Sequence, residues 1–308
     1  MAVSLAYHPQ EGEIEVQLPG SKSESNRLLI LQFLSGDAFQ INHLSDAGDT
    51  RVLKDCLNQL RSGDTSKTIT LDCKDGGTPL RFLMALCALR EGSFLLTGTQ
   101  RLMQRPQQDL IHSLRALGAS IEHLGEHGMG PWLIQGRRPT VYQWTVSMKR
   151  SSQFASALLL LAAFQESPVS LELKDTEASW PYVSMTLETM KKLGVQMEQQ
   201  GAIIKISPGI KAPNSISVEA DWSAASYFFA AQCIRKTGSM SFPNLRLHSI
   251  QGDVFLERLF RYEGLVAQEG NQGLQLYWNS KPWEAKELSI NLSAYPDLAP
   301  ALVVYYFM

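Results

Sequence analysis

The sequence predicts an α/β (α+β) protein built from repeated units of strands and helices. Two observations support this prediction: strand-like and helix-like segments alternate along the chain, and one helix–glycine–strand pattern recurs. A third observation is that no Gly-x-Gly-x-x-Gly sequence follows a predicted strand. The third observation disfavours a dinucleotide-binding fold. With 308 residues, the chain is long enough for two domains.

The first recognisable element is a strand over residues 13–18, where polar and apolar side chains alternate. Residues 28–34 form an apolar run typical of a buried helix. Between them lies the sequence LPGSKSESNR (residues 18–27), in which Pro-Gly breaks the strand from the helix.

This junction concentrates groups that bind anions. A helix that begins near Ser25 would direct its unpaired backbone N–H groups at the loop, where Lys22, Ser23 and Arg27 could meet an anion. A nucleotide P-loop has the order Gly-Lys-Ser/Thr, whereas Lys22 here follows a serine. ATP is therefore disfavoured as the ligand. A solvated basic residue at a helix start is the ordinary alternative.

One pattern recurs three times: an amphipathic helix, a Leu-Gly-like stop and a short alternating strand. The copies are residues 110–121, 186–197 and 255–266, and residues 52–60 predict a fourth helix of this kind. Each copy has a glycine where a helix ends in the left-handed conformation: Gly118, Gly194 and Gly264.

Further helix starts repeat the anion theme. They are DGGTPLRFL (75–83), Arg105 before a proline, SSQF (151–154) and SWPY (179–182). Each has an ordinary alternative, such as a capped helix with Arg81 in an ion pair, an N-cap serine or a buried structural tyrosine. The recurrence of basic and hydroxyl groups at helix starts is the strongest physical argument for a phosphorylated ligand.

Composition excludes several classes of function. The formal net charge is −2, with 44% hydrophobic and 19% charged residues, so there is no basic stripe for nucleic acid and no apolar run long enough to span a membrane. The N-terminal sequence lacks the features of a signal peptide, and we expect a cytoplasmic protein. No metal site is expected, and small core residues are the simplest interpretation of the four widely spaced cysteines, Cys56, Cys73, Cys87 and Cys233.

The sequence LPGSKSESNR resembles the signature of the 5-enolpyruvylshikimate-3-phosphate synthase family, also called 3-phosphoshikimate 1-carboxyvinyltransferase. The resemblance runs from about Leu18 to the last residue. Further motifs similar to those of the family follow in the same order, at 75–83, 105–106, 151–154, 179–182, 219–227 and 295–297.

The resemblance implies a two-domain enolpyruvyl transferase fold, an inside-out α/β barrel assembled from βαβαββ units. Residues 20–220 would form the shikimate 3-phosphate domain from three such units. Residues 1–19 and 221–308 would form the second domain. Asp221, at the crossing between the domains, and Asp253, in a Gln-Gly-Asp sequence, would have structural roles.

The resemblance also implies a ligand set for each substrate. Shikimate 3-phosphate would contact Lys22, Ser23, Arg27, Ser151, Ser152, Ser179, Tyr182 and Asp297. Phosphoenolpyruvate would contact Lys22, Gly77, Arg105 and Gln153. Arginine suits such contacts because its planar fork makes bidentate bonds to phosphate.

Two positions depart from the family pattern. Asp75 stands where asparagine is common, and Pro79 stands where alanine is common. A carboxylate adds negative charge near an anionic substrate, so we do not expect Asp75 to contact it. Gly77 is the better candidate.

The implied reaction transfers the enolpyruvyl group of phosphoenolpyruvate to the 5-hydroxyl of shikimate 3-phosphate and releases phosphate. Asp297, a candidate base for that hydroxyl, and Lys22 are the implied catalytic residues, although Asp297 alone could also be a helix N-cap. No cofactor is implied, and we expect a monomer whose partners are these two small molecules. A UDP-N-acetylglucosamine enolpyruvyl transferase is the enzymatic alternative, which typically carries a reactive cysteine.

The last residues, 298–308, are almost wholly apolar, whereas chain termini usually lie at the surface. We therefore expect the chain to be truncated and the second domain to be incomplete. The corresponding alternative for function is a catalytically inactive fragment that binds shikimate 3-phosphate weakly.

Overall fold

The computed structural model describes residues 12–64, 66–176, 180–271, 273–279, 289 and 291–307. Its contacts divide the chain into two compact units. The larger unit comprises Gly20–Val218 with Ile250–Gly252, and the smaller comprises the described residues of 12–19, 219–249 and 253–307. The domain boundary predicted at residue 220 lies at 218 in the structure, and residues 250–252, predicted in the second domain, group with the larger unit.

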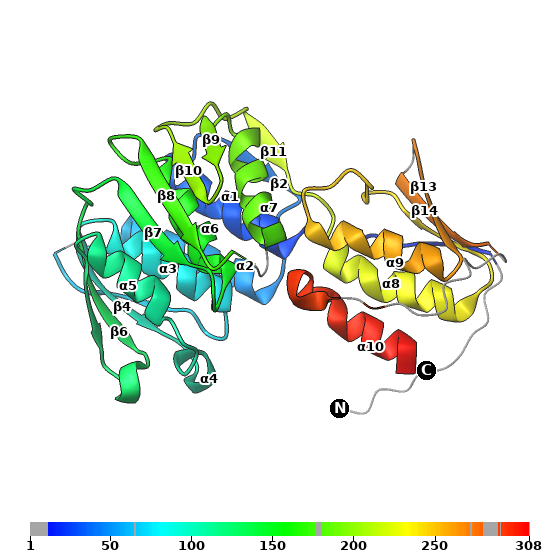
Figure 1. Ribbon diagram of the computed structural model, residues 1–308, viewed down its shortest axis with the longest axis horizontal. Coiled ribbons are helices and arrows are strands. Elements are labelled where there is room, and N and C mark those ends of the chain that lie inside the picture. The colour runs from blue at the N-terminus through cyan, green and yellow to red at the C-terminus, as the bar shows by residue number, and fades with distance from the viewer. Residues whose placement is uncertain are drawn as a thin grey trace. The chain divides into compact units, whose positions relative to one another are not determined.

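The larger unit contains two complete copies of one βαβαββ pattern (Figure 1). In each, two parallel strands are joined by a helix, and an antiparallel pair completes a four-stranded sheet. The sheet orders are β3-β4-β6-β5 and β7-β8-β10-β9.

The first copy consists of β3 (Ile69–Asp72), α3 (Gly77–Ala88), β4 (Gly92–Thr97), α4 (Gln100–Met103), α5 (Gln108–Ala116), β5 (Ser120–His123), η1 (Glu126–Gly128) and β6 (Trp132–Gly136). The second consists of β7 (Gln143–Ser147), α6 (Ser152–Ala162), β8 (Val169–Lys174), α7 (Trp180–Lys192), β9 (Met197–Gln200) and β10 (Ile203–Ile206).

The rest of the larger unit is a smaller third element. Helices α1 (Lys22–Leu34) and α2 (Gly48–Ser62) accompany a sheet in which β2 (Gln40–Asn42) pairs in parallel with β11 (Ser215–Ser217). Within the described residues this sheet has two strands, whereas the sequence predicted a third complete unit.

The central helices of the larger unit lie inside and its sheets lie outside. Ten of the twelve residues of α3 and ten of the eleven of α6 are buried, as expected for helices that are apolar all round. The strands of both four-stranded sheets instead alternate buried and more exposed side chains, because one face of each sheet meets solvent. This arrangement agrees with the inside-out barrel that the sequence predicted.

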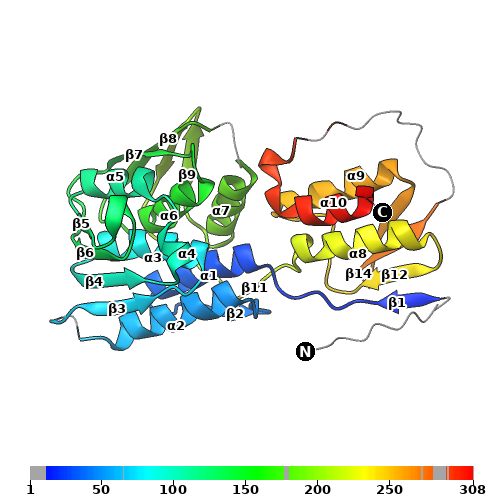
Figure 2. The same cartoon turned by 90° about the horizontal axis from the view of Figure 1, so that it is seen from below.

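The smaller unit repeats the same topology in one sheet, β1-β12-β14-β13 (Figure 2). Strand β1 pairs in parallel with β12, although 226 residues separate the partners Glu13 and Ser239. The helices of this unit lie on one face of the sheet. Its elements are β1 (Glu13–Glu15), α8 (Trp222–Arg235), β12 (Ser239–Phe242), η2 (Gly252–Phe255), α9 (Leu256–Tyr262), β13 (Leu265–Gly270), β14 (Gly273–Trp278), η3 (Leu292–Ala294), η4 (Pro296–Leu298) and α10 (Ala299–Phe307).

The recurring helix–glycine–strand pattern corresponds to the same step of each copy, namely α5–β5, α7–β9 and α9–β13. The glycines after these helices have positive φ angles of 103°, 72° and 97°, which confirms the predicted left-handed stops: Gly118, Gly194 and Gly264. Helix α2, the predicted fourth member, ends at Gly63 with φ of −71°, so it lacks this stop.

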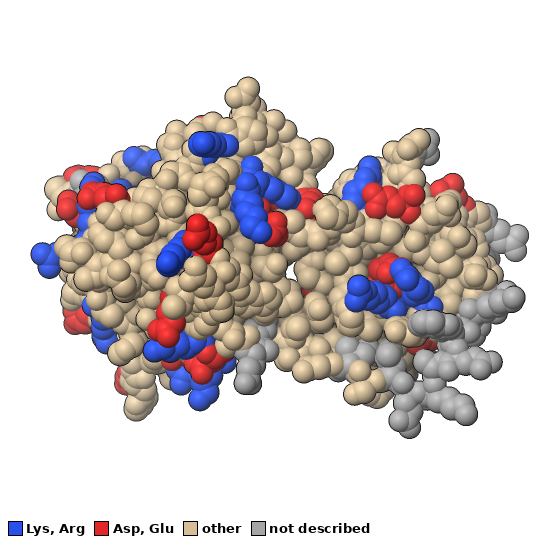
Figure 3. All heavy atoms as spheres, turned by 45° about the horizontal axis from the view of Figure 1, so that its top comes forward, with Lys and Arg blue, Asp and Glu red and all other residues tan. Residues whose placement is uncertain are grey.

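Charges of both signs are interspersed on the face drawn in Figure 3. Several are paired, as in Lys191–Glu188 at 2.7 Å. In the part of the chain that the structure describes, no helix combines the length and the hydropathy needed to cross a bilayer.

Candidate active site

The first candidate segment forms the start of helix α1. The helix begins at Lys22, three residues before the predicted start, because the Ser21 hydroxyl caps it by accepting a hydrogen bond from the Glu24 amide at 3.4 Å. Lys22 and Ser23 therefore belong to the first turn and not to the preceding loop. Their backbone N–H groups lie at the positive end of a thirteen-residue helix.

Arg27 points into the core of the larger unit and joins three helices. Its Nε donates to Thr186 Oγ1 at 2.7 Å, and its two terminal nitrogens donate to Ser156 Oγ at 3.1 Å and to the carbonyls of Ser23 and Tyr182 at 2.7 and 3.0 Å. Burial lowers the pKa of this guanidinium to about 10, so it stays charged at neutral pH. These bonds use four of its five N–H groups, which leaves one N–H group for a substrate. The contact of Arg27 with substrate stays a prediction.

Arg81 and Arg105 lie together beside the start of α3. A Cβ added to Gly77 would lie 2.7 Å from one terminal nitrogen of Arg105 and 3.7 Å from one of Arg81, so the glycine makes room for both guanidinium groups. Burial and the neighbouring charge of Arg105 lower the pKa of Arg81 to about 10. No carboxylate among the described residues forms an ion pair with either arginine. Two adjacent cations without an acidic partner have the charge that suits a multiply charged anion.

Gln153 connects this pair to helix α6. Its Oε1 accepts a hydrogen bond from Arg81 at 2.5 Å, and its Nε2 donates to Thr78 Oγ1 at 3.2 Å. The structure thus brings together three of the four residues predicted for phosphoenolpyruvate: Gly77, Arg105 and Gln153.

Arg81 is the residue that sequence analysis missed as part of this site. It was considered only as a structural ion-pair partner. Its spacing of four residues from Gly77, which places both on one face of α3, was the available signal.

Helix α6 begins with the predicted pair of serines. Ser151 is its N-cap, and its hydroxyl accepts a hydrogen bond from the Gln153 amide at 3.2 Å. Ser152 is the first residue of the helix and is buried. Tyr182 lies in the first turn of α7, and Ser179 lies outside the described residues.

Asp75 directs its carboxylate at a neighbouring hydroxyl. Its Oδ1 accepts a hydrogen bond from Thr99 Oγ1 at 2.5 Å. The expectation that Asp75 does not contact the anion directly stays a prediction.

The smaller unit gathers carboxylates around the start of α8. Asp221 is the N-cap and accepts a hydrogen bond from the Ala224 amide at 2.9 Å, which fits its predicted structural role. Asp253 is buried and accepts a hydrogen bond from Ser223 Oγ at 2.5 Å. Burial, with the charges of Asp297 and Asp221, raises the pKa of Asp253 to about 6. Asp297 is exposed and lies within η4, two residues before α10 begins.

All four cysteines are free and buried. Burial raises the pKa of the Cys87 thiol strongly and that of Cys233 to about 12, so these two are poor candidates for the reactive thiolate expected of the UDP-sugar alternative. A hydrogen bond with Cys73 instead lowers the pKa of Cys56. Among the described residues, no group of three or more His, Cys, Asp or Glu side chains could hold a metal ion.

The repeated βαβαββ topology is matched by known proteins. A sequence model of EPSP synthase (3-phosphoshikimate 1-carboxyvinyltransferase) matches residues 7–308. The 3-phosphoshikimate 1-carboxyvinyltransferase of Bacteroides fragilis (strain YCH46) is 34% identical over 303 residues, which cover 97% of this chain and 71% of the relative. That of Vibrio atlanticus (strain LGP32) is 32% identical over 319 residues, which cover 96% and 74%. The chain therefore belongs to the EPSP synthase family.

A solved structure of EPSP synthase from Acinetobacter baumannii has the same fold. It superposes with a TM-score of 0.71 and covers 96% of this chain and 71% of that one. At 18% sequence identity, this likeness supports the predicted fold class independently of the sequence matches.

Proposed function

We propose that this protein transfers the enolpyruvyl group of phosphoenolpyruvate to the 5-hydroxyl of shikimate 3-phosphate. Family membership supports the reaction. The observation that carries the proposal in this chain is the pair Arg81 and Arg105, packed against Gly77 and without a carboxylate partner among the described residues. A phosphate or carboxylate of the substrate would supply the missing negative charge.

Phosphoenolpyruvate would bind at this pair. Arg105 has an exposed side chain, so its planar fork is accessible to a phosphate. Gln153 holds Arg81 in place through its Oε1, and Gly77 leaves space for both guanidinium groups. Lys22, at the start of α1, would add a further positive charge.

Shikimate 3-phosphate would bind at the starts of α1, α6 and α7. Hydroxyl and basic groups at helix N-termini suit a phosphate because the backbone N–H groups there also point at it. The proposed contacts are Lys22, Ser23, Ser151, Ser152, Ser179 and Tyr182, with Asp297 as a ligand of the ring hydroxyls. Arg27 would position the starts of α6 and α7, because it donates hydrogen bonds to Ser156 and to the Tyr182 carbonyl.

The chemistry proceeds by addition and elimination. The 5-hydroxyl oxygen bonds to C2 of phosphoenolpyruvate as the methylene C3 gains a proton, which gives a tetrahedral ketal. The C2–phosphate bond then breaks and C3 loses a proton, so the enol ether and inorganic phosphate are released. Asp297 would accept the hydroxyl proton, and Lys22 would stabilise the developing charge. Cytoplasmic location and a monomeric state remain predictions from sequence.

Ligand-dependent thermal stability tests this proposal. Shikimate 3-phosphate should raise the melting temperature, because a ligand that binds only the folded state adds stability. UDP-N-acetylglucosamine at the same concentration is the control. Phosphoenolpyruvate added with shikimate 3-phosphate should stabilise the protein further, and Arg105→Ala should weaken this second effect about tenfold to a hundredfold in apparent affinity.

Stabilisation by the UDP-sugar alone would contradict the proposal. Release of inorganic phosphate that requires both substrates would demonstrate the transfer itself. Equal stabilisation of the wild type and Arg105→Ala by phosphoenolpyruvate would show that the arginine pair does not bind phosphoenolpyruvate.

A further inference from the structure

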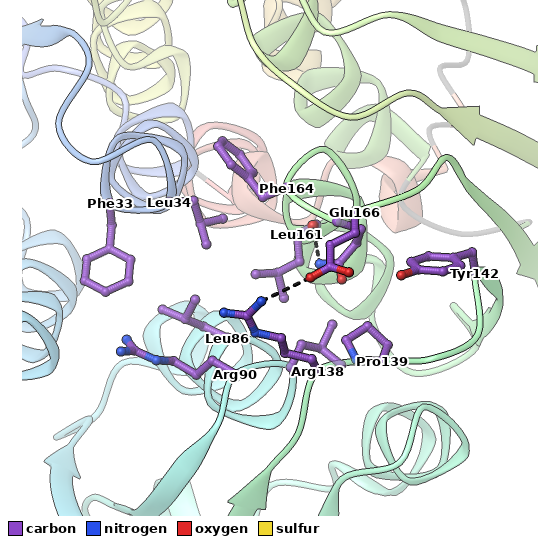
Figure 4. Close-up of a pocket in the computed structure, with 12 residues that line it drawn as sticks. Phe33, Leu34, Leu86, Arg90, Arg138, Pro139, Tyr142, Leu161, Phe164 and Glu166 are labelled. Carbon is purple, nitrogen blue, oxygen red and sulfur yellow. Dashed lines mark hydrogen bonds and ion pairs between the residues drawn. The ribbon is translucent and has the colours of Figure 1, made fainter. Parts of the chain in front are cut away.

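A pocket of about 370 Å³ lies at the opposite end of the central helices from the candidate active site (Figure 4). Its walls come from the last turn of α1, the residues that end α3 and α6, and the loop before β7. The volume falls in the range of small-molecule sites. None of the residues assigned above to either substrate lines it.

Helix length separates this pocket from the candidate active site. The substrate groups lie in the first turns of α1, α3 and α6, whereas the pocket is lined by residues at the ends of the same helices, such as Leu34 and Leu161. At 1.5 Å per residue, the thirteen residues of α1 span about 20 Å. A ligand in the pocket would therefore not contact a substrate at the helix starts.

Apolar side chains form one part of the pocket wall, and polar atoms supply slightly more of its surface. Phe33 and Leu34 come from α1, Leu86 from α3, and Leu161 and Phe164 from the end of α6. Figure 4 shows these side chains around the pocket, with Arg90 and Arg138 on one side and Tyr142 at the edge. The apolar side chains suit the apolar body of an organic molecule, and the arginines suit an anionic group on it.

The two arginines at this pocket differ in their partners. Arg138 pairs with Glu166 at 3.1 Å, so its charge is balanced. Arg90 is partly buried, and its guanidinium forms no hydrogen bond or ion pair with any group that the structure describes. It lies over two aromatic rings, 5.8 Å from the Phe33 centroid and 5.9 Å from the Phe94 centroid. The rings orient the planar group while its N–H edges stay available.

We propose that this pocket binds a small organic carboxylate with an apolar body. The carboxylate would accept hydrogen bonds from Arg90, and the apolar body would cover Leu34, Leu86 and Leu161. A neutral apolar ligand would bury part of the Arg90 charge without compensation, which costs free energy. A carboxylate compensates that charge and can form a bidentate pair with it.

The test compares 3-phenylpropanoate with its uncharged amide, 3-phenylpropanamide. Each is titrated into the full chain, and binding is followed by protein-observed NMR, which also locates the perturbed residues. The acid should bind about tenfold or more tightly than the amide. Perturbations should centre on residues 33–34, 86–90 and 161–166.

Arg90→Gln is the diagnostic variant, and Arg61→Gln is its matched control. Arg61 also lies over the Phe33 ring, at 5.0 Å, but it pairs with Asp37 and does not line the pocket. Arg90→Gln should weaken binding of the acid about tenfold, whereas Arg61→Gln should change it less than twofold. Both variants should keep the stabilisation by shikimate 3-phosphate, so failure of this proposal is distinguishable from failure of the proposed function.

Three results would overturn the proposal. The first is equal affinity for acid and amide in the wild type, a comparison that needs no variant. The second is equal weakening by Arg90→Gln and Arg61→Gln. The third is a set of perturbations centred on residues 22–27 and 77–81, which would show that the acid occupies the candidate active site.

Discussion

Both units bury a charged side chain beside the first turn of a helix, Arg27 in the larger unit and Asp253 in the smaller. Arg27 donates hydrogen bonds to four acceptors from α1, α6 and α7. Asp253 accepts one hydrogen bond, from Ser223, and its other neighbours include the carboxylates Asp297 and Asp221.

The difference shows how surroundings decide the protonation state of a buried group. Acceptors arranged around Arg27 replace water, so the guanidinium remains charged even though burial lowers its pKa to about 10. Like charges around Asp253 act in the same direction as burial and raise its pKa to about 6. The buried arginine therefore holds helices together, whereas the buried aspartate makes stability depend on pH.

Replacing Arg27 should have the largest effect. Arg27→Ala leaves Ser156, Thr186 and two carbonyls without their donor, and we expect it to lower the free energy of unfolding by about 3–5 kcal/mol. Chemical denaturation measures this loss. Arg105→Ala is the control, because Arg105 is exposed and donates no side-chain hydrogen bond to a described residue. It should change stability by about 0.5 kcal/mol or less. Equal losses in the two variants would refute the bridging role of Arg27.

Asp253→Asn should remove a pH dependence of stability. The pKa of Asp253 rises from 3.8 to about 6 on folding, so the folded state prefers the protonated acid. Between these values the unfolded chain releases its proton first, and stability falls as the pH rises through about 6. A shift of roughly two units corresponds to about 3 kcal/mol at most.

The asparagine variant cannot titrate, and its amide oxygen can still accept the Ser223 hydrogen bond. It should therefore match the wild type near pH 4 and exceed it by about 2 kcal/mol near pH 8. Denaturation of both proteins across this pH range is the measurement. A stability difference that does not vary with pH would show that Asp253 does not titrate in this way.

Gly77→Ala should separate binding from stability. The added methyl group would approach an Arg105 terminal nitrogen to 2.7 Å, and this flexible arginine can move aside at little cost in stability. We expect apparent affinity for phosphoenolpyruvate, measured with shikimate 3-phosphate present, to fall about tenfold. Gly48→Ala is the matched control, since Gly48 also begins a helix and a methyl group there meets nothing within 4 Å. If the two variants bind alike, the close approach of Arg105 to Gly77 has no role in binding.

Sequence patterns predicted the features that depend on local structure. The left-handed glycine stops follow from helix endings. The family resemblance, and not a local pattern, named Gly77, Arg105 and Gln153, which do lie together. The pairing of β1 with β12 could not be predicted from patterns, because it joins segments that lie far apart in the chain.

The orientation of Arg27 was also missed, although a signal existed. Arg27 lies four residues before Leu31 and seven before Leu34, on one face of α1. A charged residue on an apolar helical face predicts an internal partner. The identity of that partner depended on Ser156 and Thr186, which come from helices more than 120 residues later in the chain.

Asp75→Asn should have the smallest effect. Asp75 lies two residues before Gly77 and is exposed, and its carboxylate accepts a hydrogen bond from Thr99. Asparagine retains this acceptor but removes one negative charge near the arginine pair. Interactions of exposed charges contribute about 0.2–1 kcal/mol, so phosphoenolpyruvate should bind about two- to fivefold more tightly. The gain should shrink at high salt, because screening weakens the repulsion that the variant removes. Weaker binding by the variant would instead show that the Asp75 carboxylate supports the site directly.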